Sequence, residues 1–180
     1  MSKTRSTDKT RKYLESLTRD ELIDLILKFS PQSFIANINS QFSSKKEALT
    51  TFDKTSKTID KIFSDEELLY SPSEFERKLL KQLEKLRGLW DKLPSQIGDL
   101  IIKMIEDVEQ AFEDGCLYIE RYGEEDDYFE SEDVNDYVFH FVNNLPDEMK
   151  IEYVERLREI LNNSGYSTFI SAERKLSKIV

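Results

Sequence analysis

Carboxylates are the residues of this chain with the clearest potential for chemistry, and they are concentrated in one segment. Between Glu106 and Asp133 there are thirteen Asp and Glu residues and one basic residue, Arg121. The segment therefore carries a net charge of −12, whereas the whole chain carries −10. A dense acidic patch repels phosphates and attracts basic surfaces. The sequence therefore favours a surface that binds a basic partner.

Aromatic residues are interleaved with these acids. Aromatic side chains are enriched at protein interfaces, where they anchor contacts that charges steer. We therefore expect a non-catalytic protein-interaction module with a basic protein partner and no cofactor or metal ion. The residues expected to bind that partner are Glu124, Glu125, Asp126, Asp127, Tyr128, Phe129, Glu130, Glu132 and Asp133.

Two other functions are left open by the same carboxylates. An acidic surface can imitate nucleic acid. On this alternative the chain is an inhibitor or antitoxin-like protein that blocks a basic site on another protein. Carboxylates also bind hard metal ions, as in a metal-dependent hydrolase. The ligands of such a hydrolase would come from Glu106, Glu109, Glu113 and Asp127. Direct binding of nucleic acid by the folded body is disfavoured by its negative charge.

Other residue types that commonly carry catalysis are scarce. His140 is the only histidine and Cys116 the only cysteine. One chain therefore cannot build a Cys/His zinc site or a paired Glu-x-x-His di-iron site. Apolar neighbours favour a packing role for both residues. No glycine-rich phosphate-binding motif and no Gly-x-Ser-x-Gly motif occurs. The sequence therefore predicts that the chain is not an enzyme.

The elements that position these residues are predicted to be helices. Five glycines and four prolines leave long uninterrupted stretches, in which apolar residues recur at three and four positions. This pattern predicts an all-α fold of about eight helices, arranged as an irregular antiparallel bundle or a short stack of helical hairpins. The predicted helices cover 19–29, 34–42, 45–63, 72–93, 97–122, 134–145, 147–162 and 168–178.

Local signals place several helix ends. Thr18 and Glu21 have the spacing of a capping box, and Ser71 with Pro72 forms an N-cap and first-turn pair. Gly115 is expected to bend the helix that contains it.

The expected domain organisation has two parts. Residues 1–16 are expected to form a flexible segment with a net basic charge. A single helical domain covers 17–180, with an acidic loop near 123–133. No apolar run of about 18 residues occurs, and no signal-peptide core follows the basic N-terminal residues. We therefore expect a cytoplasmic protein without a membrane partner. The sequence does not set its oligomeric state.

The segment Leu17-Thr18-Arg19-Asp20-Glu21-Leu22-Ile23-Asp24-Leu25-Ile26-Leu27 resembles the opening of uncharacterised bacterial all-helical domains, including ones found beside SWIM zinc fingers. The terminal helices agree in outline, with Tyr153-Val154-Glu155-Arg156-Leu157 and Ala172-Glu173-Arg174-Lys175-Leu176. The resemblance covers roughly 17–176 and implies an all-helical accessory domain. The Cys and His ligands of a SWIM finger are absent from this chain, and no catalytic residue is carried over.

Overall fold

The fold is all-α, as predicted. The computed structural model describes residues 3–31, 34–35, 38, 43–119, 127–129, 131–165 and 168–179. Within these residues the helices are α1 (Lys3–Glu15), α2 (Arg19–Phe29), α4 (Lys45–Phe63), α5 (Glu66–Leu69), α6 (Pro72–Arg87), α7 (Pro94–Glu113), α8 (Glu132–Asn143), α9 (Asp147–Asn163) and α10 (Ile170–Leu176). Two short strands, β1 (Tyr118–Ile119) and β2 (Asp127–Tyr128), pair in antiparallel fashion. No described helix combines the length and the apolar composition needed to cross a membrane.

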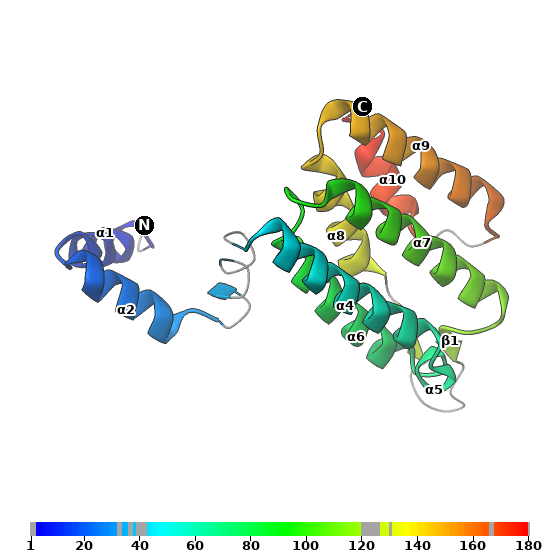
Figure 1. Cartoon of the computed structure of the whole chain (residues 1–180), viewed down its shortest axis with the longest axis horizontal. Coiled ribbons are helices and arrows are strands. Elements are labelled where there is room, and N and C mark those ends of the chain that lie inside the picture. The colour runs from blue at the N-terminus through cyan, green and yellow to red at the C-terminus, as the bar shows by residue number, and fades with distance from the viewer. Residues whose placement is uncertain are drawn as a thin grey trace.

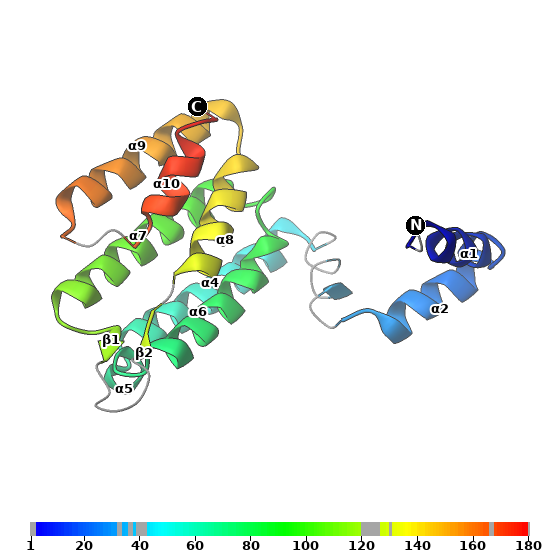
Figure 2. The same cartoon turned by 180° about the vertical axis from the view of Figure 1, so that it is seen from behind.

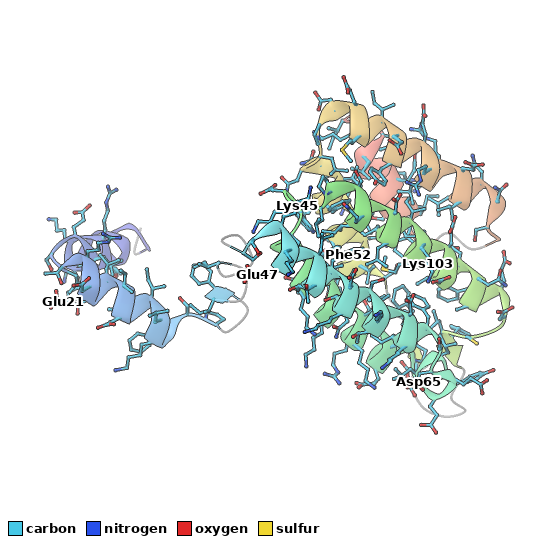
Figure 3. All side chains as sticks on the ribbon, viewed as in Figure 1. Glu21, Lys45, Glu47, Phe52, Asp65 and Lys103 are labelled. Atoms are coloured by element: carbon cyan, nitrogen blue, oxygen red, sulfur yellow. The ribbon has the colours of Figure 1, made fainter. Side chains whose placement is uncertain are left out.

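Helices α4 to α10 pack around one hydrophobic core. Helix α4 lies beside α6, α7 lies beside α9, and α10 packs against α8 and α9 (Figures 1 and 2). Most inward-facing positions of α6 and α7 are fully buried, as their helical apolar spacing predicts. Lys103 lies on α7 (Figure 3). Its Nζ lies 2.9 Å from Asp60 Oδ1 on α4, so this ion pair joins the two helices at the surface.

Capping boxes begin two of the helices. The Glu21 carboxylate accepts a hydrogen bond from the Thr18 backbone N–H at 2.8 Å, and the Glu21 N–H donates to the Thr18 hydroxyl at 3.3 Å. Ser44 and Glu47 repeat this arrangement at the start of α4, with distances of 2.7 and 3.3 Å. Glu21 and Glu47 are labelled in Figure 3. The predicted start of α2 is therefore confirmed, and its cause is the local hydrogen bonding.

Helix α7 ends earlier than predicted. The apolar period continues to Tyr122, but the helix stops at Glu113. Gly115 adopts a left-handed conformation with φ of 77°, and the Cys116 N–H donates to the Ala111 carbonyl at 2.8 Å. This is a Schellman ending, which a glycine permits at little steric cost. The predicted continuation is therefore wrong, because Gly115 ends the helix instead of bending it.

Helix α6 also ends before its apolar stripe does. It stops at Arg87, and Gly88 follows as its C-cap. Leu89, Trp90 and Leu93 lie in the turns beyond it, and all three are nonetheless buried. Burial at helical spacing therefore extends past the helix, so periodicity alone places its end too late.

The N-terminal region contains a helix that the sequence analysis does not predict. Lys3–Glu15 forms helix α1, and the expected flexibility of residues 1–16 stays a prediction. The segment lacks glycine and proline, and Arg11 pairs with Glu15 one turn later at 2.8 Å. Helices α1 and α2 lie apart from the other helices in both views (Figures 1 and 2), and α2 buries none of its residues. Most of the predicted helix 34–42 lies outside the described residues.

Candidate functional site

A small hairpin lies in the second half of the acidic segment 106–133. Tyr118 on β1 and Tyr128 on β2 are direct cross-strand partners, and 48% and 47% of their surfaces are exposed. Directly paired side chains lie on the same face of a strand pair. The hairpin therefore presents two tyrosines together at the base of the segment that connects the strands. Four of the expected partner-binding residues, Glu124, Glu125, Asp126 and Glu130, lie outside the described residues.

Asp127 has a structural partner far away in the sequence. Its Oδ1 accepts hydrogen bonds from the Ser73 hydroxyl and, at 3.1 Å, from the Ser73 backbone N–H. Ser73 lies in the first turn of α6, where backbone N–H groups lack intrahelical acceptors. Asp127 therefore caps α6 from another part of the chain. This structural role explains the carboxylate of Asp127, so no bound protein is needed to explain it.

Phe129 is a core residue. Only 4% of its surface is exposed, and its ring packs edge-to-face against Phe75 and Phe112 at centroid distances of 5.9 and 6.3 Å. Successive residues of an extended chain point to opposite sides, so Tyr128 faces outward where Phe129 faces inward. The exposed pair Tyr118 and Tyr128 therefore replaces Phe129 as the candidate aromatic anchor.

Glu132 and Asp133 form the exposed start of α8. Acidic residues in a first turn interact favourably with the helix dipole. Neither residue is buried, so both carboxylates are accessible to a partner. With Tyr128, they are the described members of the expected site that keep an exposed side chain free to make contacts.

A second acidic feature is the groove between α7 and α9, of about 390 Å³. Three of its lining residues, Glu106, Glu109 and Glu113, come from α7, and Glu159 comes from α9. Arg156 is the only basic residue among the described residues that line it. The first three carboxylates belong to the acidic segment noted in the sequence. Glu159 was missed, because no local pattern indicates that α9 packs beside α7.

Glu109 forms the buried wall of this groove. Its side chain is 4% exposed, and its Oε2 accepts a hydrogen bond from the Ser164 hydroxyl. Its Oε1 is buried and has no hydrogen-bond partner within the described part of the chain. Burial raises the pKa of the Glu109 carboxyl, while hydrogen bonding to Ser164 and Thr168 acts in the opposite direction. Glu109 is therefore a buried carboxyl group held by residues just after α9 and just before α10.

The hydrolase ligand set is only partly assembled. Glu106, Glu109 and Glu113 line the same groove, but Asp127 caps α6 and does not line it. Across the described residues, no group of three or more His, Cys, Asp or Glu side chains is arranged to hold a metal ion. A binuclear or mononuclear metal centre therefore has no geometric support in this part of the chain.

The lone histidine and cysteine lie outside the groove. His140 is exposed in the last turn of α8, beside the Phe139 ring, so its apolar neighbours do not place it in the core. Cys116 is buried and follows the end of α7. Its predicted packing position is confirmed.

Comparison with known proteins adds no relative: no family model matches the chain, and no curated protein or solved structure matches it. The resemblance to bacterial helical domains stays a prediction. Function is therefore proposed from the fold and the site alone.

Proposed function

We propose that this chain is a non-catalytic, cytoplasmic interaction module that binds a basic partner protein through its acidic hairpin. The observation that carries the proposal is the exposed cross-strand pair of Tyr118 and Tyr128. The segment between the strands contains four acidic residues, Glu120, Glu124, Glu125 and Asp126, and one basic residue. Paired tyrosines and dense negative charge therefore occur in one short element.

The two residue types have different tasks in such a surface. Tyrosine buries a large rigid area at low entropic cost and is enriched among the residues that dominate binding energy. Carboxylates speed encounter with a positively charged partner and suppress binding of acidic ones. Glu132 and Asp133 extend the acidic surface onto the start of α8.

The test is partner capture by three forms of the full chain. The first is wild type, the second neutralises Glu124, Glu125 and Asp126 as Gln, Gln and Asn, and the third is a matched control. The control neutralises three exposed carboxylates on other elements, Asp53, Glu148 and Glu155. Asp127 is left intact in all three forms because it caps α6.

A partner bound through the hairpin is retained by wild type and the control, lost by the hairpin variant, and released by moderate salt. Replacing Tyr118 and Tyr128 by Ser should weaken the purified complex with less change in its salt dependence, because their contribution is burial. Equal capture by all three forms would refute the proposal. Displacement of the captured partner by DNA or RNA would instead assign the nucleic-acid-mimicking inhibitor.

A further inference from the structure

Helices α1 and α2, residues 3–29, form an arm that lies apart from the other helices (Figures 1 and 2). We propose that this arm docks onto the hairpin end of a second copy of the chain, so that the basic partner of the acidic hairpin is the chain itself. The hairpin end consists of Tyr70, Tyr118, Tyr128 and helix α5. This inference rests on the proposed function, because it names the partner of the same surface.

The arm carries more exposed apolar side chains than its length accounts for. Of the twelve large hydrophobic side chains exposed in the described residues, six lie between Tyr13 and Phe34. Ile23, Ile26 and Leu27 are 43%, 37% and 57% exposed, and their spacing places them on one face of α2. Helix α2 has eleven residues and buries none of them, and so short a helix is marginal in water without packing. This face therefore calls for an apolar partner surface.

The charge of α1 indicates which surface covers the arm. Helix α1 contains five basic and two acidic residues, a net charge of +3, and Lys9, Arg11 and Lys12 are all exposed. The acidic segment 106–133 carries −12. Opposite charges steer two surfaces together, and like charges keep them apart. The arm is therefore matched by charge to the hairpin end, whereas pairing between two α1 helices is opposed.

The hairpin end also offers apolar surface. Tyr70 is 57% exposed and lies beside β1, because the Leu117 N–H donates to the Leu69 carbonyl at 3.0 Å and so joins the residues that precede Tyr118 and Tyr70. Tyr128 is the cross-strand partner of Tyr118. Helix α5, which precedes Tyr70, adds two exposed glutamates. Three exposed tyrosines among acidic residues thus match an arm with exposed aliphatic side chains and basic charge.

The positions of the two surfaces favour docking between copies. The arm precedes the start of α4, whereas α5 and the hairpin lie at the other end of this helix (Figures 1 and 2). Helix α4 has 19 residues, which is a length of about 28 Å, so the two surfaces of one chain lie apart. Two copies related by a two-fold axis, with antiparallel α4 helices, place each arm beside the partner's hairpin end. Such a dimer is closed, because both arms and both hairpin ends are occupied.

We expect this dimer to be weak. Each contact is made by one arm of two short helices, and small interfaces are typical of transient complexes. The dissociation constant is expected at about 10 to 100 µM. Below that range the chain is monomeric, and the arm then adds nothing to the stability of the rest of the chain.

Sedimentation velocity of the full chain, from about 5 to about 500 µM, measures the dimer. Wild type should change from monomer to dimer over this range and should dissociate in high salt. Combining Lys9→Glu, Arg11→Glu and Lys12→Glu should raise the dissociation constant by about 10-fold or more. Combining Ile26→Gln with Leu27→Gln should also raise it, with less change in its salt dependence, because these side chains contribute burial.

Two further sets of variants separate a specific contact from general charge effects. The matched control combines Lys54→Glu, Lys81→Glu and Lys178→Glu, which reverses three exposed charges on other elements and should leave the dissociation constant nearly unchanged. A charge swap tests the pairing itself. Reversing both Glu124 and Glu125 to Lys should abolish the dimer, and adding the reversed arm to the same chain should restore it.

Cross-linking tells docking between copies from docking within one chain. Isotopically light and heavy full-length chains are mixed and treated with a carbodiimide, which joins lysine amines to carboxylates. We expect peptides that contain Lys9 or Lys12 to be linked to acidic peptides of the hairpin end, with one light and one heavy member.

Three results would overturn the proposal. The first is a monomer at every concentration, and the second is an equal loss of the dimer in the reversed arm and in the lysine control. The third is a set of arm cross-links that join only peptides of the same isotope, which would show the arm docked on its own chain. Capture of a different basic protein through the hairpin, without a dimer, would exclude the second copy and keep the proposed function. Neither capture nor a dimer would remove both.

Discussion

Replacing Gly98 by Ala is expected to destabilise the protein, against the usual effect of alanine in a helix. Gly98 lies within α7, and a Cβ added there would sit 2.1 Å from both Cζ and the hydroxyl oxygen of Tyr153 on α9. Atoms cannot approach so closely, so the ring must move. This contact sets how closely α7 and α9 approach, and hence the width of the groove between them.

The Tyr153 ring has little freedom to move. It is 4% exposed, and its hydroxyl donates to the Ser95 carbonyl at 3.1 Å. Phe141 packs edge-to-face against it at 6.3 Å, and the Arg156 guanidinium lies 5.3 Å from its centroid on another side. Displacing the ring would therefore break a hydrogen bond and disturb packing on two sides.

The magnitude follows from three opposing effects. Alanine stabilises a helix interior by about 1 kcal/mol relative to glycine. Loss of the Tyr153 hydrogen bond costs about 1 kcal/mol, and overpacking of a filled site costs about 1 to 3 kcal/mol. The net expectation is a loss of about 1 to 3 kcal/mol in the free energy of unfolding, with Tm falling by roughly 2 to 4 °C per kcal/mol.

Urea unfolding followed by circular dichroism measures this loss. Gly165→Ala is the matched control, because an added Cβ there meets nothing within 4 Å, and it should be neutral or slightly stabilising. In a Tyr153→Leu background the obstructing ring end is gone, so Gly98→Ala should cost nothing or stabilise by up to about 1 kcal/mol. The reasoning fails if Gly98→Ala stabilises the wild type, or if its cost is the same in both backgrounds.

Three further predictions concern pH, a tertiary cap and the N-terminal helices. Burial raises the pKa of Glu109 above its ordinary 4.5, so the stability that this group contributes is present at low pH and lost as pH rises through the raised pKa. The urea midpoint of the wild type should therefore fall relative to that of Glu109→Gln between acidic and neutral pH. A difference between the two midpoints that does not change with pH would contradict this. Asn135→Ala should cost about 2 to 4 kcal/mol in the same assay, because its amide donates to two backbone carbonyls and accepts from the first turn of α10, and a loss below about 1 kcal/mol would show that these bonds are replaced by water. Deleting residues 1–30 should leave the thermal midpoint of the remaining chain unchanged within error, since α2 buries no residue, and a clear drop in scanning calorimetry would reveal contacts with the body.

Much of the fold could be predicted from short stretches of sequence. The capping box of Thr18 and Glu21 and the first-turn Pro72 mark helix starts through hydrogen bonds and backbone preferences within four residues. The long helices are predictable because their apolar residues recur at helical spacing within a few turns. The helix predicted over 45–63 has the observed bounds. Errors fell at helix ends such as that of α7, where an apolar stripe continues into a buried turn.

The candidate site was less predictable, because its residues are defined by distant neighbours. Acidity between 106 and 133 could be read directly from the sequence. The sequence does not show which of these carboxylates have a structural role and which are available to a partner. Asp127, for example, accepts hydrogen bonds from Ser73, fifty-four residues away. Glu109 likewise depends on the packing of α9 against α7, because the donor to its Oε2 is Ser164, fifty-five residues away.

The sequence by itself determined the helical class, most helix starts and the location of the negative charge, because these depend on residues close together in the chain. Only the tertiary structure decided that Phe129 is buried while Tyr128 is exposed, and that Glu159 faces the carboxylates of α7. The physical reason is that burial and long-range pairing are properties of the packed chain. A side chain's surroundings are set by which helices meet, and no local pattern specifies that.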